Sequence, residues 1–153
     1  MNDSTLILTL VAAIGLGTGL VFATVGEIIT ERAGNLNLGV QGMMLVGAVA
    51  GFWATFNTES LLLGVIVAMI AGAAFSVIHA FASVSLRVSQ IVSGLALTIF
   101  GTGLSSFLGE AGEDPLVGNP SKATFEPILE GGLADIPVIG PLIFGHDLMV
   151  YVS

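Results

Sequence analysis

The residues best suited to chemistry in this sequence are gathered in one short stretch, residues 26–42, called here the polar joint. It reads GEIITERAGNLNLGVQG and sets carboxylates, an arginine, amides and glycines between two long apolar segments. Polar side chains beside a bilayer core cost free energy unless they are satisfied, so such a cluster usually has a structural or transport task. We therefore interpret the polar joint as an interrupted connection between membrane spans, of the kind that transporters use at binding or gating points.

The composition places the chain in a membrane. Hydrophobic residues make up 54% of its 153 residues, charged residues only 9%, and the mean hydropathy is +1.01. A soluble domain of this size could not hide so much apolar surface. The net charge of -8 describes one region, because seven of the eleven acidic residues lie at or after Glu110. No cysteine is present, which excludes disulfides, thiolate ligands and cysteine nucleophiles.

Long uncharged segments predict an all-α, polytopic transmembrane helical bundle with four full spans and the start of a fifth. At about 1.5 Å per residue, each full span can cross a hydrocarbon core of about 30 Å. The predicted pieces are spans at about 4–26, 38–56, 61–83 and 90–109, an acidic loop at 110–141 and a truncated span at 142–153. The loop holds all five prolines, which exclude a span there. The N-terminus lacks the positive region of a secretory signal, so the first span is expected to be retained.

Small residues at four-residue spacing predict close helix packing. Gly47 and Gly51 form one such pair in the second span, and the third span carries a longer row. That row is Gly64, Ala68, Gly72, Ser76 and Ala80. His79 lies beside this row, and a neutral, hydrogen-bonded core histidine is favoured there over a proton relay.

The fourth span carries a row of polar or small residues that packs against a neighbouring helix or lines a wet path for a polar solute. The row is Gln90, Gly94, Thr98, Thr102 and Ser106. Packing is favoured, because threonine and serine can also satisfy their hydroxyls on their own helix backbone.

Two arginines predict the orientation. Arg32 follows the first span and Arg87 follows the third, so both lie on the same side of the membrane, and the positive-inside rule makes that side cytoplasmic. The N-terminus and the 110–141 loop then face outward. In that position the loop could cover the outer mouth, dock an external partner or serve only as a solvated linker.

The sequence lacks the usual signatures of an enzyme. Its single lysine, Lys122, is not preceded by a glycine-rich phosphate-binding loop. Two widely separated histidines and no cysteine predict no metal site. No serine lies in a nucleophile-elbow context. We therefore predict no catalytic residue and no cofactor, and favour movement of a solute across the membrane.

Two stretches carry a resemblance to a known family. Residues 26–44 and the segment RVSQIVSGLAL at 87–97 resemble the signature stretches of bacterial ABC-type permease subunits. The match is to the simple-sugar and nucleoside branch of the family that also serves ribose and branched-chain amino acids, and the segment IPVIGPLIFG at 136–145 resembles that branch too. The likeness covers the N-terminal half of such a subunit. Gln41 and Ser89 depart from it, because many members carry glutamate and asparagine there.

The resemblance implies a subunit of an importer in the bacterial cytoplasmic membrane. Its implied partners are a second permease subunit, a cytoplasmic ATP-binding subunit that hydrolyses ATP, an extracellular or periplasmic solute-binding protein and the lipid bilayer, with no nucleic acid polymer. The solute would be a nucleoside or simple sugar. Another small polar solute, such as a branched-chain amino acid, is the alternative within the family.

The candidate site residues fall into two groups. The predicted substrate-pathway residues are Gln41, Gln90, Ser93 and Thr98. The family-motif or gating residues are Glu27, Glu31, Arg32, Gly34, Asn35, Asn37, Gly39, Gly42 and Gly94. Asn35 or Asn37 is expected to cap the second span rather than to contact solute, and the amide of Gln41 suits a ribose hydroxyl or a base edge.

Two readings outside this family remain open. One is a small channel or secondary transporter built as an oligomer of four-span chains, which would pass solute without ATP. The other is a structural membrane subunit whose small-residue rows only pack helices.

Overall fold

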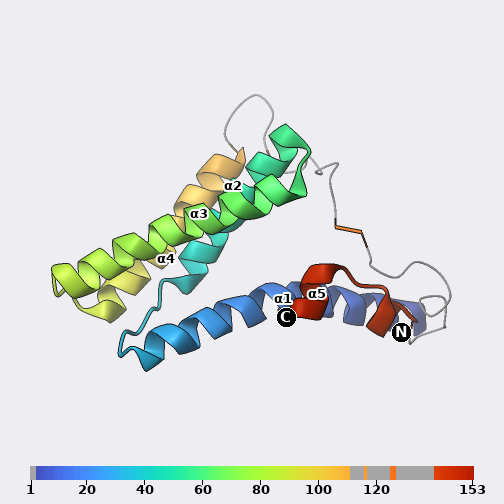
Figure 1. Cartoon of the computed structure of the whole chain (residues 1–153), viewed down its shortest axis with the longest axis horizontal. Helices are drawn as coiled ribbons and strands as arrows, with labels where there is room; N and C mark the ends of the chain where they lie inside the picture. Colours follow the sequence, from blue (N-terminus) through green and yellow to red (C-terminus); the bar gives the residue numbers. More distant parts are fainter. Residues whose placement is uncertain (1–2, 111–115, 117–124, 127–139) are drawn as a thin grey trace. The chain divides into compact units, whose positions relative to one another are not determined.

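The computed structural model describes residues 3–110, 116, 125–126 and 140–153. Helices account for 84% of these residues and none of them is in a strand, which confirms the predicted all-helical class. The elements in Figure 1 are α1 (Asp3–Arg32), α2 (Val40–Thr58), α3 (Leu61–Ala80), η1 (Phe81–Ser85), α4 (Gln90–Glu110), η2 (Gly140–Phe144) and α5 (Leu148–Val152). The segment that joins α1 to α2, residues 33–39, is called here the connector.

Three helical stretches in the described residues are long and apolar enough to cross a membrane: Thr5–Arg32, Leu61–Ser85 and Gln90–Glu110. The 19-residue α2 is not among them, so the predicted count of four full spans is not confirmed. Helix α2 carries Gln41 in its first turn and Asn57 in its last, and both lower its mean hydropathy.

The predicted fifth span is not confirmed either. Residues 140–153 form two short helices, η2 and α5, separated at residues 145–147. Asp147 begins α5, because its Oδ1 accepts a hydrogen bond of 3.1 Å from the Val150 amide. The predicted acidic loop, apart from residues 110, 116, 125–126 and 140–141, lies outside the described residues.

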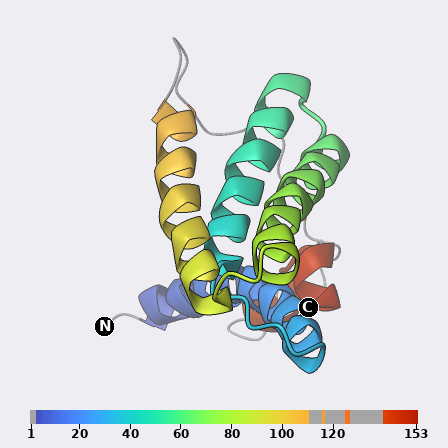
Figure 2. The same ribbon diagram turned by 90° about the vertical axis from the view of Figure 1, so that its left-hand side faces the viewer.

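The chain divides into two compact units, residues 1–26 with 125–153 and residues 27–124. The second unit holds the last turns of α1 together with α2, α3, η1 and α4. Its three long helices run side by side with α2 in the middle, as Figure 2 shows.

Helices α2 and α3 pack through the small residues that the sequence indicated. A Cβ atom on Gly51 would lie 2.8 Å from the Cβ of Ala68, and one on Gly47 would lie 3.1 Å from the Ala68 carbonyl oxygen. Gly64 makes room for the side chain of Thr55 in the same way. This close approach confirms the predicted packing role of these positions.

Helices α2 and α4 meet most closely at the connector. A Cβ atom on Gly101 would lie 2.7 Å from the Cα of Gly42, and one on Gly94 would lie 2.9 Å from the Gly39 nitrogen. The two helices separate toward their other ends (Figure 2). The core beside this crossing contains Met43, Val46, Phe75 and Leu97.

Candidate functional site

The connector is held by side chains from two helices. The Leu36 amide donates to Gln90 Oε1 of α4 at 2.8 Å, and Thr98 Oγ1 of α4 donates to the Leu38 carbonyl at 2.8 Å. From α1, Glu27 Oε1 accepts from the Asn37 amide at 2.9 Å. We call the side chains of Glu27, Gln90 and Thr98 the connector clasp. It binds three consecutive residues of the main chain.

The clasp supplies hydrogen-bond partners to the connector, where the helical hydrogen-bond pattern is interrupted. Helix ends leave amide and carbonyl groups without intrahelical partners, and such groups must find partners when they are buried. Here two of the partners are 54 and 60 residues away in the sequence. The connector is therefore joined to α4 as well as to the helices that it links.

Asn37 stabilises the connector from within. It is 8% exposed, and its Oδ1 accepts from the Gly39 amide at 2.9 Å while its Nδ2 lies 3.5 Å from the sulfur of Met43. Gly39 is the N-cap residue that precedes α2, and no side chain makes a cap hydrogen bond there. Neither Asn35 nor Asn37 therefore caps α2, and that prediction was wrong; Asn37 instead closes a turn just before the helix by accepting from the Gly39 amide. Asn35 Oδ1 is buried without a hydrogen-bond partner among the described residues, as is Glu27 Oε2.

The hydrogen bond between Leu36 and Gln90 brings the α1–α2 and α3–α4 connections to one end of the second unit. Arg32 and Arg87, which flank these connections, are both exposed. Arg87 has a φ of 53° and ends the turn after η1, and Gly34 has a φ of +84° after α1. Gly34 adopts this left-handed region without steric cost, whereas Arg87 adopts it as a non-glycine residue, which is uncommon.

Three of the four predicted pathway residues make hydrogen bonds to neighbouring elements. Gln90 and Thr98 belong to the clasp, and Ser93 is 7% exposed with its Oγ 3.1 Å from His79 Nδ1. Gln41 is exposed in the first turn of α2. Among the four, Gln41 is therefore the one whose side chain is exposed.

The family-motif residues divide by burial. Glu31, Arg32 and Gly34 are exposed, whereas Gly39, Gly42 and Gly94 are buried where α2 crosses α4. The three buried glycines therefore permit close backbone approach. Glu27 belongs to the clasp and accepts from the Asn37 amide, whereas Asn35 Oδ1 has no hydrogen-bond partner among the described residues.

The contact between His79 and Ser93 was not predicted. His79 is 2% exposed, and its Nε2 has no hydrogen-bond partner in the described part of the chain. The predicted hydrogen-bonded core histidine is thus present, with one ring nitrogen bonded. The available signal was that His79, near the end of the third span, and Ser93, near the start of the fourth, are only 14 residues apart and flank the same connection.

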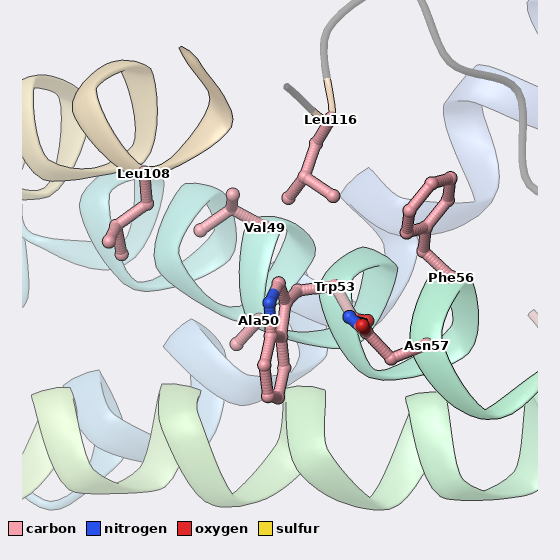
Figure 3. Close-up of a pocket in the computed structure, with 7 residues that line it drawn as sticks. All are labelled: Val49, Ala50, Trp53, Phe56, Asn57, Leu108 and Leu116. Atoms are coloured by element: carbon pink, nitrogen blue, oxygen red, sulfur yellow. Dashed lines mark hydrogen bonds between the residues drawn. The ribbon is translucent and has the colours of Figure 1, made fainter. Parts of the chain in front are cut away.

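At the end away from the connector, a cavity of about 410 Å³ lies between α2 and α4. Figure 3 shows Trp53 and Val49 of α2 and Leu108 of α4 around it. Its lining is mostly apolar, and Asn57 is the one amide side chain on it. Such a lining suits hydrocarbon rather than a sugar. No cluster of three or more histidine, aspartate or glutamate side chains in the described ranges is placed to hold a metal ion.

Comparison with known sequences decides the family. The family described as "Branched-chain amino acid transport system / permease component" matches residues 9–134, which include the polar joint, α2, α3 and α4. The chain belongs to this permease family. Among curated permeases, the "putative glucose ABC transporter permease protein TsgC13" of Haloferax volcanii is 43% identical over 143 residues. The match covers 93% of this chain and 43% of that relative, and no solved structure matches the chain.

Proposed function

We propose that this chain is the N-terminal part of the membrane-spanning subunit of an ATP-driven importer for a simple sugar or a nucleoside. The observation that carries the proposal is the family match over residues 9–134. The 43% identity to a permease named for glucose favours a sugar over a nucleoside, and over a branched-chain amino acid.

An importer of this class divides its work among chains. ATP hydrolysis belongs to a separate cytoplasmic subunit, and an external binding protein delivers the solute to a pathway formed with a second permease chain. The polar joint then lies in the cytoplasmic half of the membrane, because Arg32 and Arg87 share one end of the second unit. The acidic 110–141 segment belongs to the outer side and docks the binding protein or covers the mouth.

Gln41 is the residue that we assign to solute contact. Its amide can both donate to and accept from a sugar hydroxyl, and its side chain is exposed two residues after the end of the connector. Glycines on the opposite face of this turn bring α2 onto α4, so the position of Gln41 is set by the backbone packing beneath it.

The test is uptake into proteoliposomes that contain the permease with its ATP-binding subunit and binding protein. We expect labelled glucose to accumulate only with ATP and the binding protein. Gln41→Ala should lower the uptake rate about two- to tenfold, as expected for a lost hydrogen bond of about 0.5–1.5 kcal/mol. Asn57→Ala, which removes an exposed amide from the other end of the same helix, is the matched control.

Two results would redirect the proposal. Glucose flux through the purified permease without ATP or partner chains would favour the channel or secondary-transporter reading. Unchanged uptake in a variant with leucine at both Gln41 and Gln90 would favour a structural membrane subunit whose small-residue rows only pack helices.

A further inference from the structure

We propose that the connector clasp joins the end of α1, the connector, the start of α2 and the first half of α4 into one gating body that moves as a unit. This inference rests on the proposed transport function and assigns Gln90 and Thr98 a role within it. They are positioning residues, which hold Gln41 in place, and they do not contact the solute.

The first support is the choice of hydrogen-bond partners. A connector between two helices can satisfy its main chain locally, through caps and turns, as Asn37 does with Gly39. The Leu36 amide and the Leu38 carbonyl instead pair with side chains of α4. Two such bonds, from residues about two helical turns apart on α4, fix both the place and the angle of the connector.

The second support is the backbone contact beneath the clasp. Gly39 and Gly94 face each other, and Gly42 faces Gly101 one to two turns further along. A Cβ atom on Gly94 would lie 2.8 Å from the Leu38 nitrogen and one on Gly101 would lie 2.7 Å from the Gly42 Cα, so neither can be added without movement of one backbone. Packed interfaces of this kind shift between discrete arrangements and do not deform continuously.

The third support is the contrast with the other end of the same helices. Beyond Gly101, α2 and α4 separate around the cavity that Trp53 and Leu108 line (Figure 3). Helices α2 and α4 are therefore held together at the connector and separated at their far ends. The near ends of α2 and α4, which the clasp joins, are the part of the pair that can move as one body.

Amide hydrogen exchange tests the clasp independently of a transport assay. In the permease reconstituted in nanodiscs, Gln90→Leu should speed exchange of the Leu36 amide at least about tenfold, which corresponds to about 1.4 kcal/mol. Gln90→Glu, which keeps an acceptor oxygen, should restore slow exchange. Thr98→Val should speed exchange across the connector and Thr98→Ser should not. Unchanged exchange in Gln90→Leu and Thr98→Val would overturn the clasp, whatever the transport activity.

A disulfide tests whether the body moves as one. The chain has no cysteine, so Gly39→Cys with Leu97→Cys places the only two thiols of the chain on either side of the crossing. A Cβ atom on Gly39 would lie 3.3 Å from the Leu97 Cβ, a few tenths of an ångström closer than the Cβ atoms of a disulfide, so a small outward shift suffices to form the bond. Uptake should be the same in the oxidised and the reduced sample. Uptake that is lost on oxidation and regained on reduction would show that the two parts must separate, and would overturn the proposal.

The exchange and uptake measurements also distinguish a failure of the clasp from a failure of the proposed transport function. If the unmodified permease does not take up solute with its partners, the proposed function fails while the exchange result still decides the clasp. If uptake is normal, Gln90→Glu and Thr98→Ser should match the unmodified protein in both maximal rate and half-saturating solute concentration. A shift of the half-saturating concentration in these conservative variants would mark direct solute contact and overturn the positioning role.

Discussion

Gly101 of α4 lies directly against Gly42 of α2, so that a Cβ atom on Gly101 would be 2.7 Å from both the Cα and the carbonyl oxygen of Gly42. This contact sets the distance at which the two helices cross. The hydrogen bonds of the connector clasp depend on it, because Gln90 and Thr98 reach the connector only from a helix this close.

Gly101→Ala should therefore destabilise the fold. The added methyl group meets backbone on both sides, and overpacking of this kind costs about 1–3 kcal/mol. Gly103→Ala, two residues along the same helix, meets nothing within 4 Å and should be neutral or stabilising by up to about 1 kcal/mol, as helix propensity predicts. Denaturation in SDS, followed by the fluorescence of the single tryptophan, Trp53, measures both. Equal midpoints for the two variants would contradict the crossing.

The α2–α3 contact yields a second matched pair. A methyl group on Gly64 would overlap the Thr55 side chain, whereas one on Gly72, two turns later in α3, would be 3.9 Å from the Met43 carbonyl oxygen. Gly64→Ala should lower the SDS midpoint, and Gly72→Ala should leave it within error or raise it. Adding Thr55→Ala to Gly64→Ala removes the hydroxyl that the new methyl group would overlap and should recover part of the loss. If the SDS midpoint does not recover, the contact between residues 64 and 55 is not the cause of the lost stability.

Ser93→Ala should weaken the contact between α3 and α4. It leaves both ring nitrogens of the buried His79 without a partner among the described residues, which costs about 1–3 kcal/mol. Ser93→Thr keeps the hydroxyl and is the conservative comparison. Ser106→Ala, at an exposed position of the same helix, is the control and should change little. A Ser93→Ala protein as stable as the control would mean that the hydrogen bond contributes nothing.

The shared end of the two connections can be tested by labelling. Because the chain has no cysteine, single cysteines at Ala33, Ser89 and Asn57 can each be probed alone with a membrane-impermeant maleimide. All three positions are exposed. We expect Ala33→Cys and Ser89→Cys to react from the cytoplasmic side and Asn57→Cys from the outside. Labelling of the first two from opposite sides would refute the predicted topology and the placement of the polar joint.

The comparison of sequence and structure is clearest at Gln90. Its spacing in a polar row identified it as a residue that either packs or lines a path, and the structure pairs it with the Leu36 amide. Periodicity places a side chain on a helix face, but it does not say which main-chain group that face meets. The same limit applies to His79, whose burial was predicted and whose partner was not.

The sequence predicted the presence of the long helices better than it predicted where they end or how many of them span a membrane. Helix α1 continues to Arg32, past the first charged residues at which the predicted span ends, because glutamate and arginine are good helix formers outside an apolar segment. Between Leu142 and Ser153, Asp147 begins a new short helix where an apolar run indicated the start of a span.

The sequence by itself determined that this chain is helical, that most of its helices are apolar enough for a membrane, where their small-residue rows lie and to which permease family the motifs belong. These properties follow from composition and from spacing along one helix, which are local. Tertiary structure alone decided that Glu27, Gln90 and Thr98 bind the main chain of three consecutive connector residues. Two of those bonds join groups more than fifty residues apart, and they form only where glycines let two backbones approach closely enough for the side chains to reach.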